Sequence, residues 1–105
     1  MEQPNFSYID TLSGEDEAFK NKLIGIIKTE FPNEKDVYLQ NIAANNFKKA
    51  SENVHKLKHK ITILGLEESY KIATDYENNL KENKDLGKED FQNILKVITD
   101  FLATI

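Results

Sequence analysis

The chain has 105 residues, which is enough for one domain and too few for two, so we expect a single domain over residues 1–105. Its hydrophobic fraction of 39% and charged fraction of 30% are typical of a folded domain and exclude a disordered chain. The formal net charge is −4 and all fourteen basic residues are lysines, so the bidentate arginine contacts of nucleic-acid recognition are excluded.

Cysteine is absent from the sequence, which excludes disulfides, thiolate metal ligands and a thiol nucleophile. Residues 1–5 do not form a basic region followed by an apolar run, so no signal peptide is expected. No apolar stretch approaches the ~20 residues that a membrane-spanning helix needs. We therefore expect a cytoplasmic protein that binds neither membranes nor nucleic acids.

Apolar residues recur at helical spacing from the first segment onward. A short helix is predicted to end at Ser13-Gly14, and a second helix follows the acidic residues 15–17. Within this second segment Pro32 disfavours helical geometry at Phe31, so we expect a kink or a break there. The apolar residues predicted to face the core from it are Phe19, Leu23, Ile26, Ile27, Tyr38, Leu39 and Ile42.

Three further helices follow. Asn45-Asn46 offers a break and an N-cap, and Gly65 is predicted to end the third helix in a left-handed conformation. The fourth helix begins near Glu67, with Ile72, Ala73, Tyr76 and Leu80 inward, and residues 83–87 form the last loop before the fifth. No segment alternates with period two, so the sequence predicts an all-α fold: an up-down antiparallel four-helix bundle with a short N-terminal helix.

Most of the functional information lies in residues 54–65, where His55 and His59 stand four residues apart. With His55 at zero on a helical wheel, Lys58 lies at about −60°, His59 at about +40° and Thr62 at about −20°. These four residues, termed the histidine strip, are predicted to face away from the core. An accessible imidazole is largely neutral at physiological pH and nucleophilic, and a nearby ammonium group can stabilise an attached phosphoryl group.

Plainer interpretations of the same residues remain open at this level. An exposed histidine on a helix is most often a surface residue without a role. The His55–His59 spacing suits two ligands of a metal ion, but no third ligand is evident, so no metal site is predicted. Lys56, Lys58 and Lys60 together are typical of a solvated helix face.

The run from Val54 to Leu66 resembles the signature of histidine-containing phosphotransfer domains of multistep phosphorelays. In that family the phospho-accepting histidine is followed by an apolar residue, a lysine, a glycine, and a second glycine ten positions on. Leu57, Lys58 and Gly65 match these positions relative to His55. Weaker similarities lie at residues 12–19, at the start of the histidine helix (residues 45–47) and at Tyr76-Glu77. Two departures are His59, at the first glycine position, and Ser69, where an apolar residue is common.

The resemblance implies a phosphocarrier without kinase activity of its own. His55 would accept a phosphoryl group from a receiver-domain aspartyl phosphate and pass it to another receiver, while Lys58 stabilises the phosphate. Partners would be receiver domains of response regulators and hybrid histidine kinases. The resemblance implies no cofactor in this chain, because the Mg²⁺ belongs to the receiver, and we expect a monomer.

A docking surface is expected beside His55, with Ile63 and Leu66 as apolar residues at its exposed rim. The docking residues predicted in full are His59, Thr62, Ile63, Gly65 and Leu66. We expect His59 to hinder docking relative to glycine, and loss of Lys58 to affect the phosphate without unfolding the domain. The alternative function is a non-catalytic helical adaptor that binds proteins and never carries phosphate.

Overall fold

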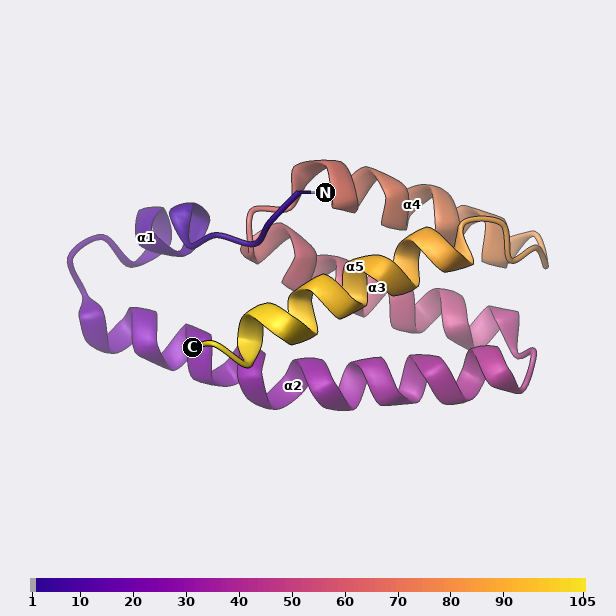
Figure 1. Cartoon of the computed structure of the whole chain (residues 1–105), viewed down its shortest axis with the longest axis horizontal. Helices are drawn as coiled ribbons and strands as arrows, with labels where there is room; N and C mark the ends of the chain where they lie inside the picture. Colours follow the sequence, from indigo (N-terminus) through magenta and orange to yellow (C-terminus); the bar gives the residue numbers. More distant parts are fainter. Residues whose placement is uncertain (1) are drawn as a thin grey trace.

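The computed structural model describes residues 2–105, and this part of the chain is all-helical, without a strand (Figure 1). The predicted all-α class is therefore confirmed, as is the short first helix. In chain order the helices are α1 (Ser7–Ser13), α2 (Glu17–Ala43), α3 (Phe47–Ile63), α4 (Glu67–Lys81) and α5 (Lys88–Leu102).

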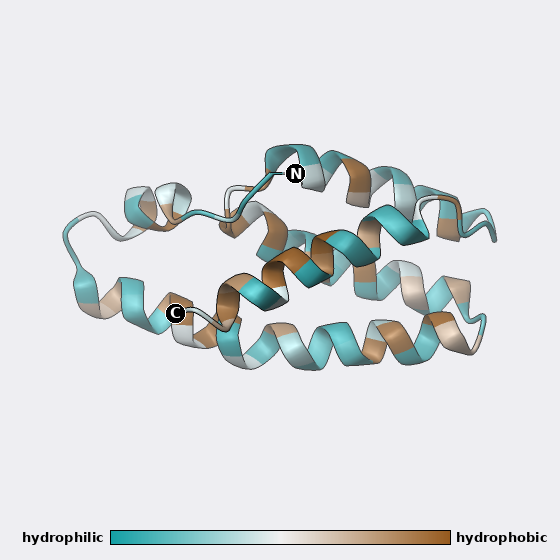
Figure 2. Cartoon of the chain, viewed as in Figure 1, coloured by the Kyte–Doolittle hydropathy of each residue, from teal (hydrophilic) through white to brown (hydrophobic). Residues whose placement is uncertain are grey.

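Helix α3 is central to the arrangement, because it packs against both α2 and α4. Helix α5 packs against α4 and α2, and α1 packs against α2. In Figure 1 successive long helices run in opposite directions along the 44 Å axis of the molecule. The hydropathy colouring of Figure 2 shows α5 with a hydrophobic side and a hydrophilic side, as a half-buried helix requires.

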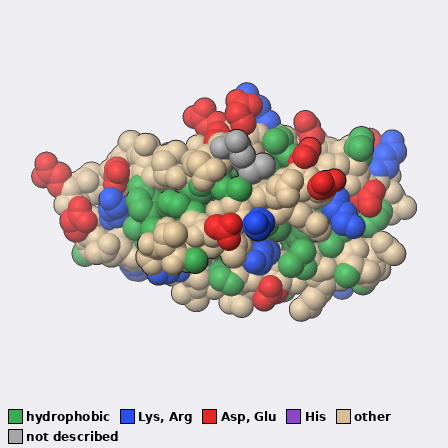
Figure 3. All heavy atoms as spheres, viewed as in Figure 1, with side chains coloured by type: hydrophobic (Ala, Val, Ile, Leu, Met, Phe, Trp, Pro, Cys, Tyr) green, Lys and Arg blue, Asp and Glu red, His purple; other side chains and the backbone are tan. Residues whose placement is uncertain are grey.

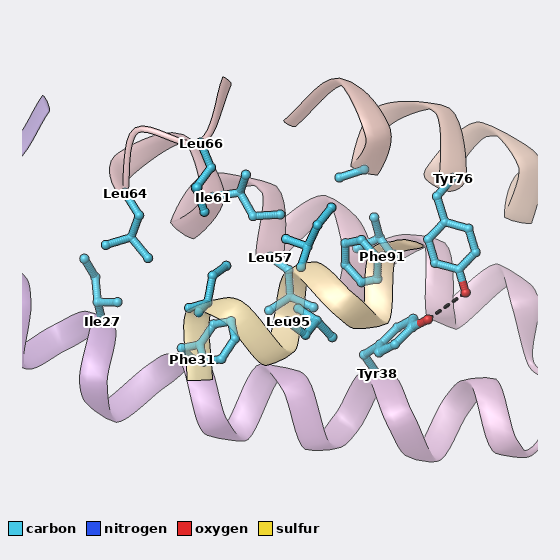
Figure 4. Close-up of a cluster of buried hydrophobic side chains, with 14 of the residues drawn as sticks. Ile27, Phe31, Tyr38, Leu57, Ile61, Leu64, Leu66, Tyr76, Phe91 and Leu95 are labelled. Atoms are coloured by element: carbon cyan, nitrogen blue, oxygen red, sulfur yellow. Dashed lines mark hydrogen bonds between the residues drawn. The ribbon is translucent and has the colours of Figure 1, made fainter. Parts of the chain in front are cut away.

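The core is built from apolar residues of all five helices, and Figure 4 shows its central part. Val54, Leu57 and Ile61 of α3 are fully buried, and their spacing of three and four residues places them on one face of the helix. At one end, the hydroxyl groups of Tyr38 and Tyr76 lie 2.6 Å apart in a hydrogen bond, beside the ring of Phe91. Burial raises the pKa of both phenols, so both hydroxyl groups stay protonated. Their hydrogen bond gives each buried hydroxyl a polar partner.

The predicted break at Phe31 is wrong, because α2 continues as one helix through Pro32. Proline removes one backbone donor, and Pro32 is exposed. The preceding Phe31 is 1% exposed and anchors the helix in the core, while the Asn33 amide donates to the Thr29 carbonyl at 3.2 Å. Burial of Phe31 before the proline, and of Tyr38 and Ile42 after it, therefore outweighs the local preference of Pro32.

Four residues predicted to face the core are partly exposed: Phe19 (42%), Ile26 (40%), Leu39 (38%) and Ile72 (38%). Phe19 and Ile26 belong to the first part of α2, and Figure 1 shows that α2 begins beyond the end of α3, with α1 alongside. In Figure 3 hydrophobic side chains gather on the surface in this region. Tyr8 and Leu12 of α1 add to the exposed apolar area there.

Gly65 ends the turn after α3 in the left-handed conformation that the sequence predicts, with φ +76°. The Gly65 N–H donates to the Thr62 carbonyl and the Leu66 N–H to the Ile61 carbonyl, which is the Schellman pattern of a helix C-terminus. The N-terminal segment closes over this turn, because the Asn5 N–H donates to the Leu64 carbonyl at 2.9 Å. The turn between α3 and α4 is thereby fixed from two sides.

Glu2 caps α4 from a distant part of the chain. Its carboxylate accepts the backbone N–H groups of Glu68 at 3.1 Å and Ser69 at 2.9 Å, in the first turn of α4. The residue preceding that helix, Leu66, supplies no side-chain cap. Partial burial acts to raise the pKa of Glu2, but these donors outweigh it and hold the pKa below its usual value.

We predict that Gly65→Ala is more destabilising than Gly14→Ala. Both positions have positive φ, which costs roughly 1–2 kcal/mol for alanine. A Cβ at Gly65 would in addition lie 2.6 Å from Asn5 Oδ1, whereas a Cβ at Gly14 would meet nothing within 4 Å. Denaturant unfolding of the two variants measures the difference, and equal losses would contradict a role for the Asn5 contact.

We also predict that Glu2→Ala lowers the free energy of unfolding by about 1 kcal/mol, the usual cost of losing a helix cap. Because the pKa of Glu2 is lowered by folding, its stabilisation is present above pH 4.5 and is lost as the pH falls through the lowered value. Denaturant titrations at pH 7 and pH 3 should show a smaller effect at pH 3 than at pH 7. Glu82→Ala is the control, since Glu82 pairs with Lys84 at 3.8 Å between exposed side chains.

Candidate functional site

His55, His59 and Thr62 are exposed along α3, as the histidine strip predicted. The His55 side chain is 59% exposed. The two imidazole rings lie edge to face with their centroids 5.5 Å apart. Both histidines are therefore accessible to a partner, and neither is a core residue.

Lys58 is the exception on the strip, because it is only 8% exposed, so its predicted solvent-facing position is wrong. Its ammonium group lies 2.9 Å from Glu77 Oε1, hydrogen-bonds to Thr74 Oγ1 at 3.3 Å and stands 5.0 Å from the Tyr70 ring centroid. All three partners belong to α4. A helical wheel of α3 gives the direction of Lys58 but not the position of the neighbouring helix. In the structure α4 covers this side of α3, so Lys58 is buried.

The lysines around the histidines do not form one solvated face, contrary to the plainer interpretation. Lys60 is 9% exposed and pairs with two carboxylates of α2, Glu30 at 2.9 Å and Glu34 at 3.4 Å. Lys56 alone of the three is exposed. Buried lysines thus tie α3 to a helix on each side, which long aliphatic stems allow.

The remaining predicted docking residues differ in accessibility. Gly65 is half-buried, and Ile63 is half-buried and packs against the core. Leu66 is 1% exposed, so its predicted place on the exposed rim is wrong. The Schellman turn at Gly65 reverses the chain and directs Leu66 into the core (Figure 4). His59 and Thr62 are the fully exposed members of the set.

Glu77 is the centre of the site. Its second carboxylate oxygen, Oε2, lies 3.3 Å from His55 Nδ1 and 3.1 Å from the ammonium group of Lys81. Glu77 is 5% exposed, and burial acts to raise its pKa, but Lys58 and Lys81 outweigh burial and hold the pKa below the usual value. The carboxylate is therefore ionised at neutral pH.

This geometry distinguishes the two nitrogens of His55. A carboxylate accepts hydrogen bonds and donates none, so Glu77 favours the neutral tautomer with its proton on Nδ1. The lone pair then lies on Nε2. In this favoured tautomer the exposed imidazole has Nε2 as the nitrogen suited to nucleophilic attack.

Two hollows adjoin residues of the predicted site, and the smaller of them is lined by His55. One, of about 510 Å³, is lined by Ser51, Glu52, His55, Lys56, Glu77 and Lys81. The other, of about 820 Å³, lies between α1 and the α3–α4 turn and is lined by Asn5, Ser7, Tyr8, Thr11, Thr62, Gly65, Glu67, Tyr70 and Lys71. The predicted residues His55, Thr62 and Gly65 thus border concave surface.

Sequence reasoning did not assign Lys81 or Thr74 to the site, and it gave Glu77 no role beyond the resemblance. The four-residue spacing of Glu77 and Lys81 was a usable signal, since such residues meet on one helix face. Their position against α3 depends on how two helices pack, which no local pattern encodes.

Neither a metal cluster nor a membrane span is found in the part of the chain that the structure describes. Across residues 2–105, no group of three or more His, Cys, Asp or Glu side chains is placed to hold a metal ion. Over the same range no helix combines the length and apolar character needed to cross a bilayer.

Comparisons with protein-family models, curated proteins and solved structures find no match for this chain. The case for a function therefore depends on the chemistry of the site and on the resemblance in residues 54–66.

We predict that Lys58→Ala lowers the free energy of unfolding by about 1–3 kcal/mol, because Glu77 would lose a buried partner. The sequence predicts only that this substitution does not unfold the domain, and the buried pair adds an expected loss of stability. Lys56→Ala, which removes an exposed lysine of the same helix, should stay within about 0.5 kcal/mol of the parent. Denaturant unfolding compares the two. Equal stabilities would show that the Lys58–Glu77 pair contributes nothing net.

Proposed function

We propose that this chain is a phosphocarrier that accepts a phosphoryl group on His55 from the aspartyl phosphate of a receiver domain and passes it to a second receiver. The observation that carries the proposal is the pairing of an exposed His55 with a buried, ionised Glu77 at Nδ1. A surface histidine without a role needs no such partner. The resemblance of residues 54–66 to phosphotransfer domains supports the same function.

The proposed step is an in-line displacement at phosphorus. The Nε2 lone pair forms the new N–P bond while the P–O bond to the aspartate breaks, and aspartate leaves as a carboxylate. The imidazole keeps its proton on Nδ1 and becomes positively charged, and the nearby Glu77 carboxylate stabilises that charge. Attack by a second receiver's aspartate reverses these bond changes and restores neutral His55.

The remaining components are expected from the partner. Phosphoryl transfer depends chiefly on positioning and charge stabilisation, and in the family that this chain resembles the Mg²⁺ and acidic pocket belong to the receiver. The proposal therefore includes no kinase activity and no cofactor of the chain's own. It also includes an up-down four-helix bundle formed by α2 to α5, a monomeric state and a cytoplasmic location.

We propose that receivers dock on the face that holds His55, His59 and Thr62. These side chains are exposed on consecutive turns of α3, and the larger hollow adjoins Thr62 and Gly65. Lys58 is not free to contact a docked partner in this conformation, because its ammonium group is engaged by α4. Its proposed contribution to the phosphate is accordingly indirect, through Glu77.

The test is phosphoryl transfer from receiver domains that have been phosphorylated with labelled acetyl phosphate and Mg²⁺. We expect acid-labile label on the parent chain and on His59→Gln, and none on His55→Gln. His59→Gln is the matched control, because its ring is exposed one turn away on the same helix.

Two outcomes would contradict the proposal. Label that persists in His55→Gln but is lost from His59→Gln would place the reaction on the other histidine. Absence of label from all three chains, together with stable binding of a receiver, would favour the adaptor function instead.

A further inference from the structure

Lys58, the cation that the resemblance assigns to the phosphoryl group, already contacts side chains of α4. Its ammonium group contacts Glu77 Oε1 and Thr74 Oγ1, and it faces the Tyr70 ring. Moving it to a phosphoryl group would leave the Glu77 carboxylate buried without its 2.9 Å partner. Removing a partner from a buried charge is costly, so Lys58 is poorly suited to follow a group that comes and goes.

Lys81 has the opposite properties. It is 58% exposed, and its ammonium group lies 3.1 Å from Glu77 Oε2, the same oxygen that approaches His55 Nδ1. It lines the 510 Å³ hollow together with His55. An exposed lysine loses little when it exchanges one anionic partner for another, because water solvates it throughout.

We propose that Lys81 is the residue that binds the phosphoryl group carried by His55, which rests on the function proposed above. When the group is attached, the Lys81 ammonium moves from Glu77 Oε2 to a phosphoryl oxygen. Glu77 keeps Lys58 on Oε1 and the Nδ1 proton of His55 near Oε2, so the buried carboxylate is never left without a partner. Lys58 is then a positioning residue, which holds Glu77 in place for both His55 and Lys81.

Charge supports this exchange. In the unphosphorylated site one carboxylate, Glu77, stands among two ammonium groups, so the cluster carries an excess positive charge. A phosphoryl group brings two negative charges and the phosphorylated ring one positive charge, which makes the cluster neutral. The positive charge of Lys81 is therefore not neutralised within the cluster before phosphorylation and is neutralised after it.

The experiment phosphorylates the chain chemically, so that it does not depend on a receiver. In a His59→Gln background, His55 is the remaining histidine, and phosphoramidate transfers its phosphoryl group to Nε2 as the P–N bond breaks and ammonia leaves. The loss of phosphohistidine over time is followed by ³¹P NMR at low and high salt. The variants are Lys81→Gln, Lys81→Arg and, as control, Lys84→Gln, which removes an exposed lysine that also pairs with a glutamate.

We expect Lys81→Gln to lose its phosphoryl group roughly two- to fivefold faster at low salt, the effect of one exposed charge contact. Lys81→Arg and Lys84→Gln should match the background chain. The difference should shrink near 1 M salt, where the screening length is about 3 Å. Equal rates for Lys81→Gln and Lys84→Gln would overturn the proposal, as would an effect of Lys81→Gln that salt does not change.

The two proposals fail in distinguishable ways. If receivers do not transfer phosphate but chemically formed phosphohistidine still depends on Lys81, the phosphocarrier function fails and the phosphoryl site stands. If receivers do transfer phosphate and Lys81 has no effect, the assignment of Lys81 alone is wrong. If phosphoramidate leaves His55 unmodified, the histidine is not the accessible nucleophile that both proposals require.

Discussion

The buried carboxylate of Glu77 is the constraint on which the site depends. An ionised group that is 5% exposed is tolerated only when charged partners reach it, and here they come from two helices. Lys58 of α3 must meet Glu77 of α4, so the pair restricts how far one helix can slide along the other. The same restriction places Glu77 Oε2 against His55 Nδ1. The orientation of the imidazole is thus a consequence of satisfying a buried charge.

Helix α3 is held in the same way on its other flank, where Lys60 reaches Glu30 and Glu34 of α2. Two lysines that are two residues apart point to opposite sides of the helix and join it to different neighbours. The C-terminal end of α3 is fixed by the Gly65 turn and by the N-terminal segment that caps α4. A histidine on such a helix can stay exposed while its backbone and its Nδ1 contact are held, which is what the proposed transfer to and from a partner requires.

The sequence was sufficient for the helices, for the Gly65 turn and for the exposure of His55, His59 and Thr62, because each depends on local periodicity or on one residue's backbone preference. It was insufficient for Lys58, Lys60 and Leu66. Whether a residue at the edge of an apolar stripe is buried depends on how closely the adjacent helices approach, which is a tertiary quantity. The break predicted at Phe31 is wrong for a related reason, since burial of Phe31 outweighs the backbone hydrogen bond that Pro32 removes. Glu2 caps backbone groups that are 66 and 67 positions away in the sequence. Rules based on local residue spacing do not predict contacts at that separation.

Under the proposed function, the different contacts of the two Glu77 oxygens would let the site gain and lose a doubly charged group without rearranging its core. Oε1 faces the buried lysine, and Oε2 faces the exposed histidine and the exposed lysine. The contacts that set helix packing therefore lie on one oxygen, and those that can change with phosphorylation lie on the other. Under the proposed function, a lysine at position 58 that was free for phosphate would have to leave the buried carboxylate at each transfer, which would couple each transfer to the packing of α3 on α4. Separating a permanent cation from an exchangeable one removes that coupling, because the exchange occurs where water screens the charges.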